Sequence, residues 1–328
     1  MKARLKLKLF ESSNNFSRSH PKKKVIIECY GGLGNQLLAT FIGLYCSQKY
    51  DRLLHVDYLY LDSKRSSGFD FTVFDWGESI EVLNNPAKSR TKSFWQLLDS
   101  LSYRSKIWRV FEKRILGIFR EVYFPVKTFQ DLDDICKFKG DIRLKGYWFQ
   151  KMFAQELFAI DSLKELSLIS PSKFFLKMKS ECAEIEPIGV HIRRGDYSKE
   201  SFGQLDELYY LKIIQNILRE QVRPIWLFLD DDKILSEIPN LVKLASEAIT
   251  SKSLPNPAES MVLMSLCKVF LLSNSSFSYV AGLFSSGEIH APWPLRPPGV
   301  ELTPGRLEVE KNEIFPDNWK SFPSIWRE

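Results

Sequence analysis

The sequence predicts an α/β protein with two Rossmann-like domains and mostly parallel sheets, and three observations support this class. The chain has 328 residues, of which 44% are hydrophobic, and a chain of this length is expected to form two domains. Short apolar segments alternate with amphipathic ones, and strands that alternate with helices pair in parallel sheets. A charged cluster ends the apolar segment 187–193, and open α/β sheets bind ligands at the carboxyl ends of their strands.

The predicted elements follow one another along the chain. Strands are predicted at 25–30, 53–57, 141–148, 187–193, 224–230, 269–273 and 288–292. Helices are predicted at 205–221, 257–267 and 276–286. This alternation is clearest in the second half of the chain, which therefore carries the stronger prediction of a Rossmann-like domain.

Polar residues and Pro171 interrupt the pattern near 165–175 and predict a domain boundary there. The chain is divided into a basic N-terminal arm at 1–24, an N-terminal α/β domain at 25–167 with a helical insertion at 86–123, a C-terminal Rossmann-like domain at 168–302, and a tail at 303–328. We expect the arm to be disordered. The insertion is basic and aromatic, and the helical spacing of its aromatic residues favours a solvated helix pair over a nucleic-acid face.

Composition narrows the cellular context. The five cysteines are scattered and show no C-x-x-C spacing, so neither a disulfide framework nor a structural zinc site is expected, and a reducing cytoplasm fits best. The arm lacks the apolar centre of a signal peptide, and no stretch of 18 uncharged apolar residues occurs. Alternating Lys and Leu residues beside Phe10 leave one alternative, a peripheral contact with the inner face of the membrane.

A glycine-rich loop, "GGLGNQ" at 31–36, joins the first predicted strand to a helix. Glycines at such a junction let backbone N–H groups close on a phosphate. A dinucleotide site would place a ribose-binding acid at Asp57, but Leu37 stands where that fingerprint needs a third small residue. We therefore disfavour a dinucleotide site, and a plain strand-to-helix turn without a ligand remains the alternative.

The segment "GVHIRRGDYSKESFG" at 189–203 carries the most informative charges. Strand periodicity sends His191 and Arg193 to one face and Arg194 to the other. One arginine can then reach a ligand while the other clamps the turn, and such a pair can neutralise a diphosphate without a metal. The alternative is a structural ion pair between an arginine and Asp196.

Two further segments follow predicted strands. In "SNSSFS", Asn and Ser residues begin a helix, where they can cap it or, with the free N–H groups, attract phosphate. In "LDDDK", Asp230 and Asp232 have the D-x-D spacing of manganese-dependent transferases. Helix capping explains these acids equally well, and the arginine pair supplies the charge that a metal would bring, so no metal and no other cofactor is predicted.

Together, "HIRRGDY", "GGLGNQ", "FLDDD", "MSLCK" and "SNSSFS", which are spread over residues 31–284, resemble the motifs of the family 11 α-1,2-fucosyltransferases. The resemblance implies a GT-B architecture, in which two Rossmann-like domains face a cleft, the first on the acceptor side and the second on the donor side. It implies an inverting enzyme that moves fucose from GDP-fucose to a hydroxyl group, O-2 of galactose, on a glycan acceptor. No nucleic-acid partner is implied.

The resemblance also assigns site residues. The donor-binding residues that it implies are Gly31, Gly32, Gly34, Asn35, Gln36, His191, Arg193, Arg194, Asp230, Asp231, Glu259, Asn274, Ser275, Ser276 and Phe277. Glu259 enters because Ser260 replaces the Asp that commonly binds the nucleobase in this family. Tyr147 and Trp148 resemble an acceptor-stacking block, and core packing is the alternative.

The catalytic residues implied are Arg193 and Arg194 at the leaving group, with Asp196 as first and Glu200 as second candidate for the base that accepts the hydroxyl proton. A reaction without a protein base stays open. Two other functions also stay open. One is a fucosyltransferase of another linkage, α-1,6 or protein O-linked, and the other is a non-enzymatic basic protein that binds nucleotides or nucleic acid.

Overall fold

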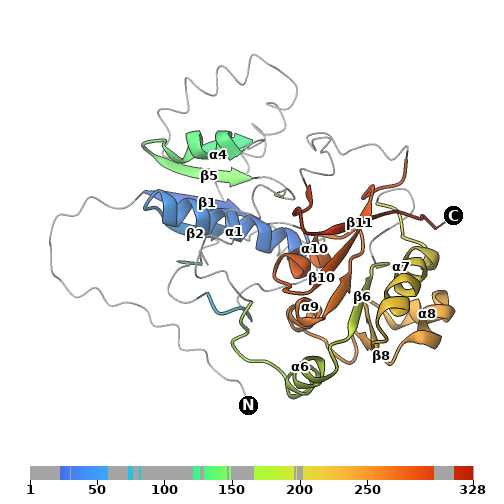
Figure 1. The fold of residues 1–328 in the computed structure, drawn as a ribbon. Helices are drawn as coiled ribbons and strands as arrows, with labels where there is room; N and C mark the ends of the chain where they lie inside the picture. The colour runs from blue at the N-terminus through green and yellow to red at the C-terminus, as the bar shows by residue number, and fades with distance from the viewer. Residues whose placement is uncertain are drawn as a thin grey trace.

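The computed structural model contains two α/β units, each with its own sheet (Figure 1). It describes residues 23–29, 31–57, 73–76, 81–82, 121–125, 129–145, 148, 166–195, 197, 202–298 and 314–327. All pairings between named strands are parallel. The predicted class, α/β with two mostly parallel sheets, is confirmed.

The first sheet has the strand order β3-β2-β1-β5-β4. Its strands are β1 (Lys24–Glu28), β2 (Leu53–Asp57), β3 (Glu81–Val82), β4 (Glu121–Pro125) and β5 (Asp141–Lys145). Helices α1 (Leu33–Lys49) and α4 (Phe129–Cys136) share a buried apolar cluster with one face of this sheet. Strand alternation leaves Glu28, His55, Asp57 and Arg143 on the other face.

The second sheet has the order β11-β10-β9-β6-β7-β8. Its strands are β6 (Ile188–Ile192), β7 (Ile225–Leu229), β8 (Glu247–Thr250), β9 (Val269–Leu271), β10 (Glu288–Trp293) and β11 (Lys320–Pro323). Numbered from β6, this is the 3-2-1-4-5-6 order of a Rossmann sheet. The order reverses between β6 and β9, and ligands bind at such a switch point, outside the carboxyl ends of the strands.

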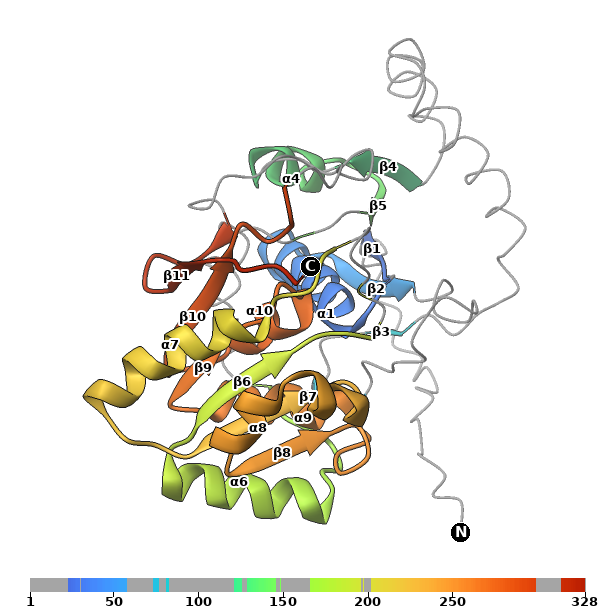
Figure 2. The same ribbon diagram turned by 90° about the vertical axis from the view of Figure 1, so that its right-hand side faces the viewer.

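Helices cover both faces of the second sheet (Figure 2). The apolar residues of α6 (Lys173–Ile185), α9 (Pro257–Leu266) and α10 (Ser276–Leu283) join the cluster on one face. Those of α7 (Glu207–Glu220) and α8 (Pro239–Leu244) join a separate cluster on the other. A short 3₁₀ helix, η5 (Asp232–Glu237), links β7 to α8.

The two units meet where α1 packs on α10. The two helices approach closely at Gly34, where a Cβ atom would lie 2.4 Å from the carbonyl carbon of Ser276 and 2.6 Å from the amide nitrogen of Phe277. Only glycine allows this contact, because a Cβ atom there would overlap the backbone of the neighbouring helix. The glycine loop of the first unit is thereby held against the start of α10.

Apart from the helical insertion at 86–123, each predicted strand and helix is present, with ends shifted by a few residues. The elements β3, β4, β8, β11, α4, α6 and α8 were not predicted from the sequence pattern. The helical prediction for 86–123 is wrong at its end, since β4 begins at Glu121, and the rest of that segment lies outside the described residues, as does most of the arm. Strand β11 lies in the segment predicted as a tail and extends the second sheet.

All five cysteines are buried and free. Among the helices that the structure describes, none has the length and the apolar composition needed to span a membrane.

Candidate functional site

The candidate site is built around the carboxyl end of β6, at the switch point of the second sheet. Apolar Ile188, Val190 and Ile192 bury one face of this strand against α7. The alternation places His191 on the opposite face, toward α10, where its ring centroid lies 5.4 Å from that of Phe277. The charged residues therefore follow a strand whose position is fixed by burial on both faces.

His191 is held as a neutral side chain. Its Nδ1 lies 2.8 Å from the hydroxyl of Ser273 at the end of β9, so the two strands at the switch point are joined by a side-chain hydrogen bond. Burial, together with a smaller effect of the nearby Arg193 guanidinium, lowers the pKa of His191 to about 3. A neutral imidazole orients its neighbours and carries no charge to a ligand.

Arg193 is the more accessible of the two arginines. Its side chain is 29% exposed, and its Nη1 lies 3.2 Å from Oδ2 of Asp230 at the end of β7. The guanidinium carbon lies 5.7 Å from the ring centroid of Tyr197. Gly195 makes room for this arrangement, since a Cβ atom there would lie 2.5 Å from Asp230 Oδ2.

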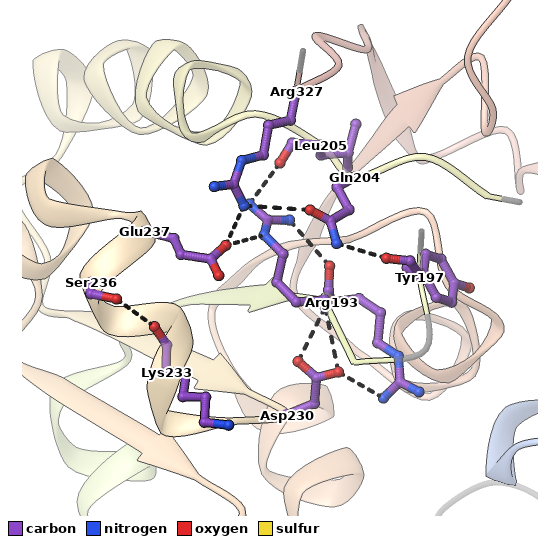
Figure 3. A network of polar contacts seen from close by, with 10 residues as sticks. Arg193, Tyr197, Gln204, Leu205, Asp230, Lys233, Ser236, Glu237 and Arg327 are labelled. Atoms are coloured by element: carbon purple, nitrogen blue, oxygen red, sulfur yellow. Dashed lines mark hydrogen bonds and ion pairs between the residues drawn. The ribbon is translucent and has the colours of Figure 1, made fainter. Parts of the chain in front are cut away.

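Arg194 is buried and turned back into the protein. Its Nη2 donates to the carbonyl of Leu205 at 2.9 Å, and its Nη1 donates to the carbonyl of Arg193 at 3.1 Å. Its Nε lies 3.3 Å from Oε2 of Glu237, and its side chain is only 7% exposed. The sequence predicted that one arginine could reach a ligand while the other clamps the turn, and in the structure Arg194 occupies the clamping position. Two of its partners, Leu205 and Glu237, are labelled in Figure 3.

The start of α10 forms the other wall of the switch point. Ser275 caps the helix by accepting a hydrogen bond from the amide of Phe277 at 3.1 Å. Asn274 donates through Nδ2 to the carbonyl of Phe202 at 3.0 Å, which ties this turn to the loop that follows the arginines. Ser276 is half-buried. The free N–H groups of a first helical turn and the helix dipole make this a suitable place for a phosphate.

The glycine loop lies on the same side of the molecule, because Gly34 contacts the backbone of Ser276. Gly31 has a φ of +76°, a value that favours glycine. Gln36 donates through Nε2 to the carbonyl of Gly31 at 2.8 Å and so fixes the turn from below. The backbone of Gly31 and Gly32 is exposed and Asn35 is half-buried, so the structure brings this loop to the α10 end of the site.

The aspartates after β7 have separate partners. Asp230 contacts Arg193 and also accepts from the amide of Arg194 at 3.2 Å. Asp231 caps η5 by accepting from the amide of Lys233 at 2.9 Å, and Asp232 is paired with Lys252. Capping, which the sequence allowed as an explanation, is therefore the role of Asp231. No group of three or more metal-binding side chains occurs among the described residues.

Several predicted residues are engaged elsewhere or lie outside the described chain. Glu259 is buried and accepts hydrogen bonds from the backbone and hydroxyl of Ser172, at 2.5 and 2.8 Å, which ties α9 to α6. Trp148 is buried, which favours its packing alternative. Tyr147, Asp196 and Glu200 lie outside the described residues.

Asp57, the acid that a dinucleotide site would need, forms an ion pair with Arg143, 2.6 Å from its Nη1. Glu28 lies 3.5 Å from the same nitrogen. The carboxylate of Asp57 is thus engaged within the first sheet, which argues against a dinucleotide site.

Sequence reasoning missed the residues that hold the arginines. These are Tyr197, Gln204, Glu237 and Arg327. Only Tyr197 is close to the arginines in sequence, and nothing in the local pattern around Glu237 or Arg327 indicates that either would reach them.

Comparison with known proteins agrees with the motifs. The family model "Glycosyl transferase family 11" matches residues 143–290, while no curated protein sequence matches the chain. Among solved structures, a mutant of Arabidopsis thaliana FUT1 in complex with GDP is 16% identical, with a TM-score of 0.49, and the alignment covers 87% of this chain and 74% of that one.

Two bacterial structures show similar values. Fucosyltransferase NodZ from Bradyrhizobium is 15% identical, with a TM-score of 0.45 and coverage of 80% of this chain and 93% of that one. A glycosyl transferase of family 9 from Veillonella parvula is 10% identical, with a TM-score of 0.46 and coverage of 92% and 85%. The family match contains β6, the arginine pair and the start of α10, so the candidate site lies within the region that is similar to glycosyl transferase family 11.

Proposed function

We propose that this protein is an inverting fucosyltransferase that moves fucose from GDP-fucose to a hydroxyl group of a glycan, with O-2 of galactose as the acceptor position. The observation that carries this proposal is that Arg193 follows β6 and the start of α10 follows β9, the two neighbouring strands at the switch point of a sheet in Rossmann order. The family match and the motif resemblance supply the choice of donor. This arrangement supports the binding of a nucleoside diphosphate.

The chemistry follows from the charges that develop during transfer. Cleavage of the bond between fucose and GDP leaves negative charge on the β-phosphate and positive charge on the sugar. Arg193 and the N–H groups of the first turn of α10 are fixed donors that can stabilise the leaving group as its charge grows. Arg194 contributes by holding the carbonyl of Arg193 and adding positive charge beneath the site.

The first unit contributes the donor-side loop. Gly34 holds the loop against α10, so we place this loop over the donor. The other loop residues on the donor side are Gly31, Gly32, Asn35 and Gln36. We place the acceptor on the side of the first domain, with Tyr147 as a stacking residue. Asp196 is the first candidate and Glu200 the second for the base that accepts the proton of the acceptor hydroxyl.

The proposal is tested by offering the purified chain GDP-fucose, GDP-mannose and UDP-galactose in turn, with a galactose-terminated oligosaccharide as acceptor. We expect transfer from GDP-fucose alone and a product with fucose at O-2 of galactose by linkage analysis. Transfer to another position would change the proposed linkage, but GDP-fucose would remain the assigned donor. Binding of oligonucleotides that weakens with salt, together with no binding of GDP, would contradict the proposal as a whole.

A further inference from the structure

The arginine pair is supported by a segment that lies outside the family match. Residues 325–327, which we call the C-terminal clasp, follow β11 and pair with the loop that precedes α7. Leu205 and Trp326 form an antiparallel bridge. The amide of Asp206 donates to the carbonyl of Ile325 at 2.7 Å, and the amide of Arg327 donates to the carbonyl of Gln204 at 2.8 Å.

One route leads from the clasp to Arg194. The guanidinium of Arg327 contacts Oε2 of Glu237, the atom that also lies 3.3 Å from Nε of Arg194. The bridged residue Leu205 supplies the carbonyl to which Arg194 donates at 2.9 Å. Two of the three named partners of the Arg194 guanidinium, Leu205 and Glu237, are therefore held by the clasp (Figure 3).

A second route leads to Arg193. The side chain of Gln204 accepts from Arg327 Nη1 at 3.4 Å and donates through Nε2 to the carbonyl of Tyr197 at 2.6 Å. The ring of Tyr197 lies under the guanidinium of Arg193, and its amide donates to the carbonyl of Arg194 at 2.8 Å. The clasp thus reaches both arginines through short chains of polar contacts.

The charges of this network also depend on Arg327. Arg193, Arg194 and Arg327 face two carboxylates, Asp230 and Glu237, so the group carries one net positive charge. Without Arg327, Glu237 would act on Arg194 alone and the network would be neutral. An anionic ligand at Arg193 would then meet a weaker positive field.

We propose that the C-terminal clasp positions the arginine pair for a nucleoside diphosphate, with Arg327 acting through Glu237 and Gln204. The identity of the ligand rests on the proposed function, whereas the support of the arginines by the clasp does not. Arg327 is a positioning residue, since its contacts are with the residues that hold the arginines and not with the site itself.

The test compares Arg327→Ala with Arg327→Lys and with Lys320→Ala. Lys320 is a matched control, because it lies in β11 and pairs with Glu288 at 2.7 Å, away from the arginines. We expect Arg327→Ala to raise the Kd for GDP on the order of three- to tenfold, the size of effect expected for a partly exposed charge contact. Arg327→Lys and Lys320→Ala should stay within about twofold of the wild type.

Guanosine has no phosphates, so it distinguishes a specific effect on the position of the arginines from a general loosening of the site. Its affinity should be equal in the wild type and in Arg327→Ala. Hydrogen exchange without ligand gives a second readout, in which the amides of Arg194 and Tyr197 should exchange faster in Arg327→Ala and not in Lys320→Ala. If Arg327→Ala fails to fold, Arg327→Gln keeps a hydrogen-bond donor at the clasp and carries the same expectations.

The proposal is overturned if Arg327→Ala binds GDP like the wild type, or if it loses guanosine and GDP affinity equally. It is also overturned if Lys320→Ala and Arg327→Ala lose GDP affinity to the same extent. A wild-type chain that does not bind GDP would contradict the proposed function, and the exchange comparison would then decide whether the clasp supports the arginines.

Discussion

Arg193 and Asp230 form an ion pair across the ends of β6 and β7, with 3.2 Å between Nη1 and Oδ2. Asp230 also accepts from the amide of Arg194, so one carboxylate holds the side chain of the first arginine and the backbone of the second. The two adjacent arginines nevertheless lie in different environments, because Arg193 is 29% exposed and Arg194 is 7% exposed. Alanine variants of the two arginines should therefore differ in their effect on stability.

Replacing Arg193 by Ala should weaken GDP binding by about 10- to 100-fold with little change in stability, since a charge-assisted contact with a phosphate would be lost from a partly exposed site. Replacing Arg194 by Ala should lower both GDP affinity and the free energy of unfolding, because Glu237 would lose a buried partner and the carbonyl of Leu205 would lose its donor. Calorimetric titration with GDP and denaturant unfolding measure the two effects. Equal losses of stability in the two variants would contradict this division of roles.

Replacing Gly34 by Ala should separate α1 from α10. The added Cβ would meet the backbone of Ser276 at 2.4 Å, and a backbone contact cannot be relieved by a change of rotamer. We expect a loss of about 1–3 kcal/mol in the free energy of unfolding, typical of overpacking, together with weaker GDP binding. For the free energy of unfolding, Gly32→Ala is the matched control, because a Cβ at Gly32 meets no atom within 4 Å. The comparison is made on stability, since Gly32 itself lies in the proposed donor-side loop. The same loss in both variants would mean that the close approach is not the cause.

The parts of the fold that were predicted are those with a strong local signal. Buried parallel strands such as β6 and β7 are uninterrupted apolar segments, and α7 has regular apolar spacing, so each is visible in the sequence. Strand β11 has only four residues, ends in Pro323 and lies at the edge of its sheet, so it has no such pattern. Strand β4 was not predicted, because it begins within a segment whose aromatic residues have helical spacing.

The site was predictable to the extent that its residues follow strands. His191, Arg193, Asp230 and Asn274 all lie at carboxyl ends, and the order of a parallel sheet brings those ends together. The partners of Arg194 could not be predicted, because Glu237 and Leu205 meet it only through tertiary packing. Glu259 was expected to bind the donor because it lies beside a motif position, but in the structure it ties α9 to α6.

His191 should make stability fall with acid. Burial lowers the pKa of the folded state from 6.5 to about 3, so the unfolded chain binds a proton between these values and the folded chain does not. The contribution is full above pH 6.5 and is lost as the pH falls toward 3, and the loss at pH 5 amounts to about 2 kcal/mol. Denaturant unfolding of the wild type and of His191→Gln at several pH values measures it as a difference. An identical pH dependence in both proteins would contradict the low pKa.

We expect transfer from GDP-fucose to continue in excess EDTA. Arg193 and the start of α10 supply positive charge at the proposed leaving group, while Asp230 and Asp232 are already engaged with Arg193 and Lys252. Initial rates with EDTA, and after adding back manganese or magnesium, should agree within about twofold. Activity that is lost in EDTA and restored by manganese would instead assign Asp230 and Asp232 as metal ligands.

Two acids that follow the arginines in sequence, Asp196 and Glu200, should be distinguished by kinetics. If Asp196 is the base, Asp196→Asn should keep GDP affinity within a few-fold while transfer falls by roughly 10² to 10⁴, the range typical of a lost general base. If Asp196 anchors the arginine pair instead, the same variant should lose GDP affinity and transfer together, because loosened arginines bind the diphosphate less well in the ground state as well. Glu200→Gln provides the comparison. A selective loss of transfer in that variant, with Asp196→Asn unaffected, would move the assignment to Glu200, and unchanged transfer in both would favour a reaction without a protein base.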